Sequence, residues 1–179
     1  MITGLVLAGG RGRRVGGADK GLLLYQGQPM AKYSLDALSP WCSRLFINCN
    51  RNAEQYAALG ATTVTDRVTD FPGPLVALAD LLPCLPGARF LILPCDTPGV
   101  RAAHVAQLLQ ASERHPGAWV YLRAEGRDHP LHACVPRTLL ASLRHQVQER
   151  GETRMMALLG QLPSVALPVM DAHAFNCNT

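Results

Sequence analysis

The sequence predicts a three-layer α/β fold around a mostly parallel central sheet. Short apolar runs that end in Gly, Asn, Asp or Pro alternate with longer segments of helical period, which is typical of strands and helices that follow one another. Hydrophobic residues make up 48% of the 179 residues and charged residues 17%, which is enough apolar material for a continuous core. We expect a single domain over residues 1–179.

The first half of the chain alternates strand and helix. The run 3–7 is apolar and stops before two glycines, as a buried strand does. Pro74 suits a first helical turn, where N–H groups lack intrahelical partners, and leucines at 75, 78, 81 and 82 give that helix an apolar face. The expected elements are strand Thr3–Leu7, helix Pro29–Leu38, strand Arg44–Cys49, helix Asn52–Leu59, strand Thr62–Thr65 and a helix that begins near Pro74.

The second half continues the pattern. The run 90–93 is wholly apolar, and leucines at 139, 140 and 143 lie on one side of a predicted helix. The expected elements are strand Phe90–Leu93, helix Ala102–Glu113, strands Trp119–Leu122 and Leu131–Val135, helix Arg137–Glu149 and strand Val165–Val169. In open sheets of this kind ligands bind at the carboxyl ends of the strands, so residues that follow strands are the strongest candidates for a site.

Composition argues against several classes of protein. No apolar run approaches the length that spans a bilayer, and the run Leu5–Ala8 is too short for a signal sequence. The six cysteines include no CxxC pair, and several lie in apolar strands, which indicates buried, reduced thiols rather than a zinc site. We therefore expect a cytoplasmic protein with no membrane partner.

The formal charge of +4 does not by itself indicate nucleic acid. Four of the 17 basic residues lie between Arg11 and Lys20, where the phosphates of a small ligand suffice to explain them. Aromatic residues are only 6% of the chain and are not interleaved with the basic ones, as stacking on bases requires. We expect no nucleic-acid partner.

A glycine- and arginine-rich loop follows the first strand. Five glycines before Lys20 let the backbone approach a polyphosphate with its N–H groups, and guanidinium groups neutralise phosphate oxygens. The Walker pattern fails because no GKS or GKT follows. The dinucleotide pattern fails because the GxGxxG spacing is wrong and Asn48 and Asn50 stand where a ribose-binding acid is expected. A solvated surface loop is the remaining alternative.

The motifs resemble those of the molybdenum cofactor guanylyltransferases. LAGGRGRRVGGADKGLL, followed by GQP, matches the family's first loop, and Gly9, Gly10, Gly12 and Arg14 match the broader GGxGxRM signature, with Val15 in place of the usual Met or Leu. The resemblance covers essentially the whole chain through NCNR, Asp66, DFPGPL, PCDTP, GRDHP and FNCNT, in the family's order and spacing.

The resemblance implies a Rossmann-like nucleotidyltransferase fold, GTP and Mg2+ as requirements, and a molybdopterin cofactor as acceptor. It implies that the N-terminal part binds GTP and the C-terminal part binds molybdopterin. The nucleotide-binding residues that it implies are Leu7, Ala8, Gly9, Gly10, Lys20, Asn48, Asp66 and Asp96.

We assign catalytic roles to Lys20, Arg14 and Asp96. A mobile ammonium at the end of the loop suits the charge that builds on phosphates during transfer. Asp96 follows an apolar strand, where a carboxylate can bind a hard cation that bridges phosphate oxygens, so it is the expected Mg2+ ligand. The alternatives are a surface lysine for Lys20 and a helix N-cap for Asp96.

Asn48 and Asp66 end two neighbouring strands and therefore face the same edge as the loop. A carboxylate accepts from the N1 and N2 donors of guanine, which cytosine and adenine do not present in that arrangement. Which of the two meets the base stays open, and turn formation is the alternative for each.

The expected acceptor-binding residues lie in the second half. The segment 127–130 lies between two predicted strands, and Arg154 opens a later helix. His129 has a binding role in this hypothesis, because a phosphate nucleophile is already anionic and needs no base; a structural histidine is the alternative. The full set is Arg127, Asp128, His129, Arg154, Asn176 and Asn178, of which Asn178 has a carbonyl oxygen that can also reach the metal.

These residues predict that the chain transfers GMP from GTP to the terminal phosphate of the molybdopterin cofactor and releases diphosphate. Alternatives within the class are CMP transfer to the same acceptor and a sugar-phosphate nucleotidyltransferase. From another class, a non-catalytic GTP sensor or cofactor carrier is the rival, although such a protein needs no Lys20 or Asp96. Transient contact with delivery or acceptor proteins is expected.

Overall fold

The computed structural model describes residues 1–10, 17–67 and 73–175. A seven-stranded sheet forms its centre, in the order β5-β4-β1-β6-β8-β7-β9. The strands are β1 (Ile2–Leu7), β4 (Arg44–Asn48), β5 (Thr62–Val64), β6 (Arg89–Pro94), β7 (Trp119–Ala124), β8 (Arg127–Pro136) and β9 (Ser164–Val169). All pairings are parallel except the two made by β8, so the prediction of a mostly parallel sheet is confirmed.

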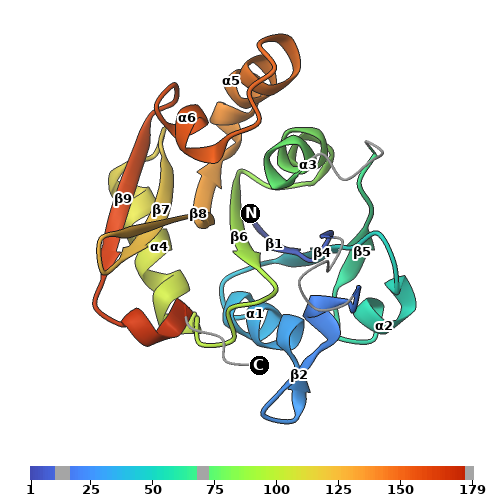
Figure 1. The fold of residues 1–179 in the computed structure, drawn as a ribbon. Coiled ribbons are helices and arrows are strands. Elements are labelled where there is room, and N and C mark those ends of the chain that lie inside the picture. Colours follow the sequence, from blue (N-terminus) through green and yellow to red (C-terminus); the bar gives the residue numbers. More distant parts are fainter. Residues whose placement is uncertain (11–16, 68–72, 176–179) are drawn as a thin grey trace.

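Helices cover both faces of this sheet (Figure 1). They are α1 (Met30–Leu38), α2 (Ala53–Ala57), α3 (Pro74–Leu81), α4 (Ala102–Arg114), α5 (Leu140–Arg144) and α6 (Met155–Leu159). One buried cluster joins the sheet to α1, α2 and α4, and a second joins it to α3, α5 and α6. The three layers are those expected from the sequence, with an apolar core on each side of the sheet.

Most element boundaries follow local chemistry. Pro74 is the first residue of α3, behind Gly73 with a φ of 101°, which glycine tolerates at no steric cost. The helix expected over 137–149 is present as a 3-10 turn, α5 and a π-helical turn over His145–Glu149. A two-stranded hairpin, β2 (Leu24–Tyr25) and β3 (Gln28–Pro29), precedes α1 and was not predicted.

The expectation that residues 127–130 lie between two strands is wrong. Glu125 and Gly126 both have positive φ, 50° and 74°, so two residues suffice to turn the chain. Arg127 pairs at once with Ala124, and residues 127–130 therefore form the first part of β8. Their side chains lie on a strand rather than in a loop.

No helix in the described ranges is both long and apolar enough to cross a bilayer.

Candidate active site

The carboxyl ends of four parallel strands meet at one edge of the sheet. Leu7, the last residue of β1, lies in register with Asn48 of β4 on one side and with Pro94 of β6 on the other. Just beyond the strands, the Ala8 N–H donates to the Asn48 carbonyl at 2.9 Å, and the Cys95 N–H donates to the Leu7 carbonyl at 3.0 Å. The segment 7–10 therefore begins between the ends of β4 and β6.

This edge is also where the chain reverses its direction across the sheet. From β1 the chain moves outward through α1 to β4 and β5, and then returns through α3 to β6 on the other side of β1. α1 and α3 pack on opposite faces of the sheet, so the connections on the two sides of β1 run over opposite faces. Ligands of open α/β sheets bind at such a point.

Lys20 and Asp96 meet at this edge although 76 residues separate them. Lys20 Nζ lies 2.9 Å from Asp96 Oδ2, and both side chains remain more than one-third exposed. Asp96 does not cap a helix, since α4 begins at Ala102 with Arg101 as its N-cap. The structure thus brings together two of the three predicted catalytic residues; the third, Arg14, lies outside the described residues.

Asp19 anchors the segment that carries Lys20. Its side chain is only 7% exposed, accepts a hydrogen bond from the Tyr56 hydroxyl and another from Asn52 Nδ2 at 3.0 Å, and lies 3.8 Å from Arg51 Nε. Burial, and then the hydrogen bond to Asp19, raise the pKa of Tyr56, which keeps the phenol protonated as a donor.

Glycine at position 21 makes this anchor possible. A side chain there would meet the Tyr56 hydroxyl at 2.6 Å, so the 3-10 turn Lys20–Leu22 packs directly on the phenol. The buried Asp19–Tyr56 contact consequently fixes the position of the backbone at Lys20.

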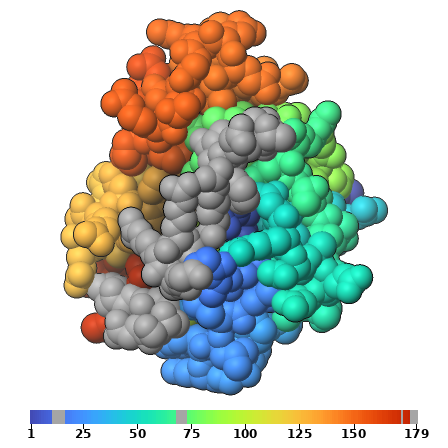
Figure 2. Space-filling view, turned by 45° about the vertical axis from the view of Figure 1, so that its right-hand side comes forward, coloured from blue at the N-terminus to red at the C-terminus, as the bar shows by residue number. Residues whose placement is uncertain are grey.

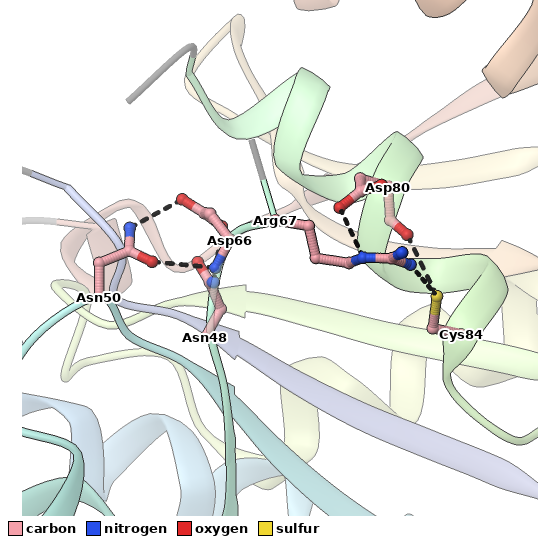
Figure 3. Close-up of polar contacts among 6 residues, drawn as sticks. All are labelled: Asn48, Asn50, Asp66, Arg67, Asp80 and Cys84. Carbon is pink, nitrogen blue, oxygen red and sulfur yellow. Dashed lines mark hydrogen bonds and ion pairs between the residues drawn. The ribbon is translucent and has the colours of Figure 1, made fainter. Parts of the chain in front are cut away.

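Asp66 receives two amide side chains at the ends of β4 and β5 (Figure 3). Asn48 Nδ2 donates to Asp66 Oδ1 at 2.8 Å, and Asn50 Nδ2 donates to Asp66 Oδ2 at 2.7 Å. Asn48 is only 2% exposed, whereas Asp66 is partly exposed. The two predicted residues are therefore adjacent, with Asn48 lying beneath a carboxylate that stays accessible.

Gly9 packs against the same amides. A Cβ at position 9 would lie 2.5 Å from Asn48 Oδ1 and 3.1 Å from Asn50 Nδ2, so only glycine allows this approach. A Cβ at Gly10, one residue on, would have no neighbour within 4 Å among the residues that the structure describes. The two adjacent glycines therefore have different surroundings.

Arg67 turns away from Asp66. Its guanidinium lies 4.0 Å, by Nε, from the Asp80 carboxylate on α3 and donates from Nη1 to Cys84 Sγ at 3.2 Å (Figure 3). Arg67, the residue next to Asp66, therefore contacts Asp80 and Cys84 and not the Asp66 carboxylate. In the space-filling view the broad blue surface, which belongs to the segment that includes α1, adjoins the cyan and teal surface of the segment that includes α2 (Figure 2).

The described residues suit a metal that is shared with a substrate. They contain no group of three or more His, Cys, Asp or Glu side chains that could hold an ion. Asp96 offers a single partly exposed carboxylate beside Lys20. Mg2+ is commonly bound by one or two carboxylates together with substrate phosphates, so this edge fits such an ion better than a metal held by protein ligands alone.

Three of the residues predicted to bind an acceptor, Arg127, Asp128 and His129, lie on β8 in the other half of the sheet. Asp128 on β8 forms an ion pair with Arg123 on β7, with Arg123 Nε 2.5 Å from Asp128 Oδ1. Arg127 is exposed beside this pair. Arg154 is the N-cap of α6 and is 82% exposed, while Asn176 and Asn178 lie outside the described residues.

His129 is part of an aromatic cluster that reaches the Asp96 segment. Its ring stacks on Phe175 at 3.8 Å, and His132 meets Phe175 edge-on at 4.9 Å. His132 is buried and its Nε2 lies 2.9 Å from Thr97 Oγ1, in a hydrogen bond one residue after Asp96. Burial lowers the pKa of His132 to about 3, and burial together with Arg127 lowers that of His129.

Sequence reasoning did not select Asp19 and Asn50 as site residues. Both belong to motifs that were recognised, ADKG and NCNR, but Asp and Asn are common in turns, and nothing in the string distinguishes a buried carboxylate from a solvated one. The sequence did offer one indication: Asp19 is next to Lys20, and Asn50 is two residues after Asn48.

The sequence is similar to a known family of nucleotidyltransferases along most of its length. Residues 4–165 match the family model of the MobA-like NTP transferase domain. A molybdenum cofactor guanylyltransferase of Pseudomonas paraeruginosa is 37% identical over 98% of this chain and 89% of its own length. Another with the same name, from Ralstonia nicotianae, is 36% identical over 99% of this chain and 92% of its own length.

Two solved structures share the fold. The molybdopterin-guanine dinucleotide biosynthesis protein A of Archaeoglobus fulgidus superposes with a TM-score of 0.74 at 21% identity, over 93% of this chain and 83% of its own. A Mycobacterium tuberculosis protein crystallised in complex with manganese gives a TM-score of 0.69 at 20% identity, over 94% and 88%.

Proposed function

From the premise that this chain belongs to the MobA-like NTP transferase family, we propose that it transfers GMP from GTP to the terminal phosphate of a molybdenum-bearing molybdopterin cofactor. An oxygen of that phosphate attacks the α-phosphorus of GTP and forms a new P–O bond. The bond between the α- and β-phosphates breaks, and diphosphate leaves. The chain is a nucleotidyltransferase, as its relatives are.

The observation that carries the proposal is the Lys20–Asp96 pair at the point where the sheet connections diverge. An ammonium and a carboxylate 2.9 Å apart neutralise each other before substrate arrives. When GTP binds, Lys20 turns to its phosphates and Asp96 to the accompanying cation. Phosphoryl transfer requires little covalent chemistry from side chains, so positioning and charge neutralisation are what these residues supply.

A divalent cation fits this arrangement, and we take it to be Mg2+. Asp96 would hold such an ion, and the ion would withdraw charge from the phosphate oxygens of the substrate. The manganese complex of the Mycobacterium tuberculosis protein supports a divalent metal in this fold. In this proposal Asp96 would hold the metal, while the contact between Asp19 and Tyr56 holds the turn that carries Lys20.

Asp66, rather than Asn48, reads the guanine in this proposal. The Asn48 side chain is buried and donates one amide hydrogen to Asp66, whereas the Asp66 carboxylate is partly exposed. A carboxylate has about four lone-pair positions, so its oxygens retain capacity for the N1 and N2 donors of guanine after accepting two amide hydrogens. Cytosine presents no such pair of donors, which disfavours CMP transfer.

The acceptor is assigned to the edge of β8 and to α6. Arg127 and Arg154 are exposed cations that suit the phosphate of the acceptor, and Asp128 supports this surface by holding Arg123. His129 is stacked on Phe175, so it shapes the surface through its ring. The free thiols of the described cysteines agree with a cytoplasmic location, where delivery and acceptor proteins contact the chain transiently.

The test is release of diphosphate from each of the four nucleoside triphosphates, with Mg2+ and molybdopterin cofactor present. We expect GTP to be preferred, and Lys20→Ala and Asp96→Asn each to lower the rate about 100- to 1,000-fold, as loss of one preorganised charge commonly does. Chelation of the metal should abolish release, and added Mg2+ should restore it.

A second ion pair supplies the matched control. Lys32 and Asp36, 2.6 Å apart on the exposed side of α1, allow Lys32→Ala and Asp36→Asn to make the same chemical changes away from the site. These variants should retain the wild-type rate. Preference for CTP would refute the base assignment, and an active Asp96→Asn variant would refute the catalytic role of Asp96.

A further inference from the structure

The side chain of Asn50 joins three segments at the edge of the sheet. Its Nδ2 donates to Asp66 Oδ2 at 2.7 Å, and its Oδ1 accepts the Asp66 N–H at 2.9 Å (Figure 3). The same Nδ2 also donates to the Gly9 carbonyl at 3.0 Å. An amide nitrogen has two hydrogens, so both are used, and the carbonyl oxygen is used as well. Asn50 thereby connects the start of the glycine loop to both the backbone and the carboxylate of Asp66.

No other residue type of similar size makes these three contacts. Aspartate has the shape of asparagine but has no hydrogens to donate, and it would place a negative charge between a carbonyl and a carboxylate. Serine and threonine have one hydroxyl hydrogen, which cannot serve both acceptors. The geometry therefore requires a side chain that donates twice and accepts once in one plane.

The hydrogen-bond partners of Asp66 leave its carboxylate able to accept from a ligand. Both carboxylate oxygens accept from neutral amides, while Arg67 is held away by Asp80 and Cys84. A carboxylate paired with an arginine would present its lone pairs to the guanidinium instead of to a ligand. With amide partners, the Asp66 carboxylate has a fixed orientation and stays partly exposed.

We propose that Asn50 is a positioning residue that couples recognition of the base by Asp66 to the placement of Gly9, at the start of the glycine-rich segment. It holds the plane of the carboxylate at the angle that a two-donor base edge requires, and through the Gly9 carbonyl it sets the distance from that base to the triphosphate. This role rests on the proposed function, because it takes the nucleotide to bind along Asp66 and Gly9. Asn50 itself does not touch the nucleotide.

The consequence is that loss of Asn50 weakens selectivity among bases more than it weakens the fold. A carboxylate free to rotate still attracts N–H donors, but it no longer favours a base with two adjacent donors over a base with one. ITP isolates this effect, because it is GTP without the 2-amino group. Its N1–H, ribose and triphosphate are unchanged.

The experiment measures dissociation constants of GTP, ITP, CTP and ATP for the full chain and its variants by calorimetry. Wild type should bind GTP about 10- to 100-fold more tightly than ITP, the usual worth of one hydrogen bond to a charged group. Asn50→Ala should reduce this ratio to about threefold or less, because the pairing loses its fixed geometry. Asn50→Asp, which keeps the size but not the donors, should bind GTP more weakly than Asn50→Ala.

Asn52→Ala is the matched control, since Asn52 lies two residues further on and donates to Asp19 rather than to Asp66. It should alter nucleotide affinity without altering the GTP-to-ITP ratio. Thermal unfolding of each variant separates effects on binding from loss of the fold. If Asn50→Asp does not fold, the GTP-to-ITP ratio of Asn50→Ala decides the test.

Two outcomes overturn the inference. If Asn50→Ala keeps the wild-type ratio, Asn50 does not position the base-reading group; if Asn50→Asp matches wild type, only the size of the side chain matters. A wild-type preference for another triphosphate refutes the proposed function instead. In that case the role of Asn50 is tested on the preferred triphosphate: Asn50→Ala must still reduce the ratio of affinities by which wild type prefers it.

Discussion

Substitution of Gly9 by alanine tests how closely the first strand approaches the amides beneath it. The new Cβ would lie 2.5 Å from Asn48 Oδ1, about 0.9 Å closer than the 3.4 Å at which ordinary contact begins. Asn48 cannot swing into solvent, because its side chain is buried and donates to Asp66 at 2.8 Å. Either this hydrogen bond breaks or the loop moves away from β4.

The magnitude follows from the contact that is lost. A hydrogen bond to a charged group contributes about 1.5–3 kcal/mol, and overpacking a filled site costs a similar amount, about 1–3 kcal/mol. We therefore expect Gly9→Ala to lower the free energy of unfolding by about 1.5–3 kcal/mol. For a chain of this size that corresponds to a fall in Tm of about 3–12 °C.

The assay is urea and thermal unfolding without nucleotide, followed by GTP binding. Gly10→Ala is the matched control, because a Cβ at Gly10 meets nothing within 4 Å among the described residues and the backbone there has no positive φ. Its free energy of unfolding should stay within about 0.5 kcal/mol of wild type, as is usual at uncrowded positions.

Equal stability of the two alanine variants would refute the reasoning, since the substitution is the same and only the surroundings differ. A destabilised Gly9→Ala that still bound GTP as tightly as wild type would separate packing from recognition. In that case the Asn48–Asp66 contact would not be needed for binding.

Three further predictions concern other parts of the site. Tyr56→Phe removes a donor from the buried Asp19 carboxylate, so the free energy of unfolding in urea should fall by about 1–3 kcal/mol; an unchanged value would contradict the anchor. His132 has its pKa lowered to about 3 by burial, so the unfolded chain binds a proton below pH 6.5 that the folded chain does not. Stability should therefore be full above pH 6.5 and fall as the pH drops toward 3, by up to about 1.4 kcal/mol per pH unit, and His132→Asn should lessen this slope in urea titrations at pH 7, 5.5 and 4.5; parallel curves would refute the assignment. Arg127→Ser should raise the KM for the molybdopterin acceptor and leave that for GTP unchanged in steady-state assays, whereas the reverse would move the acceptor elsewhere.

Much of the site was predictable because it follows strands. Asp96, Asn48 and the Gly9 segment each come directly after an apolar run, and parallel strands place such residues at one edge. The approximate bounds of the strands and helices followed in the same way from apolar periodicity, which is a local property. The start of β8 was missed because the Glu125–Gly126 turn depends on two positive φ angles, a feature that Gly126 alone did not signal.

The sequence by itself determined the fold class, and it predicted a phosphate-binding loop after the first strand and candidate residues for metal and base. The tertiary structure decided which of them act on one another. Lys20 meets Asp96 across 76 residues, and Asn50 and Asp19 become hydrogen-bond partners of side chains distant in sequence. The reason is that hydrophobic patterning is written along the chain, whereas a hydrogen bond between distant side chains exists only once the packed layers set their separation and exclude water.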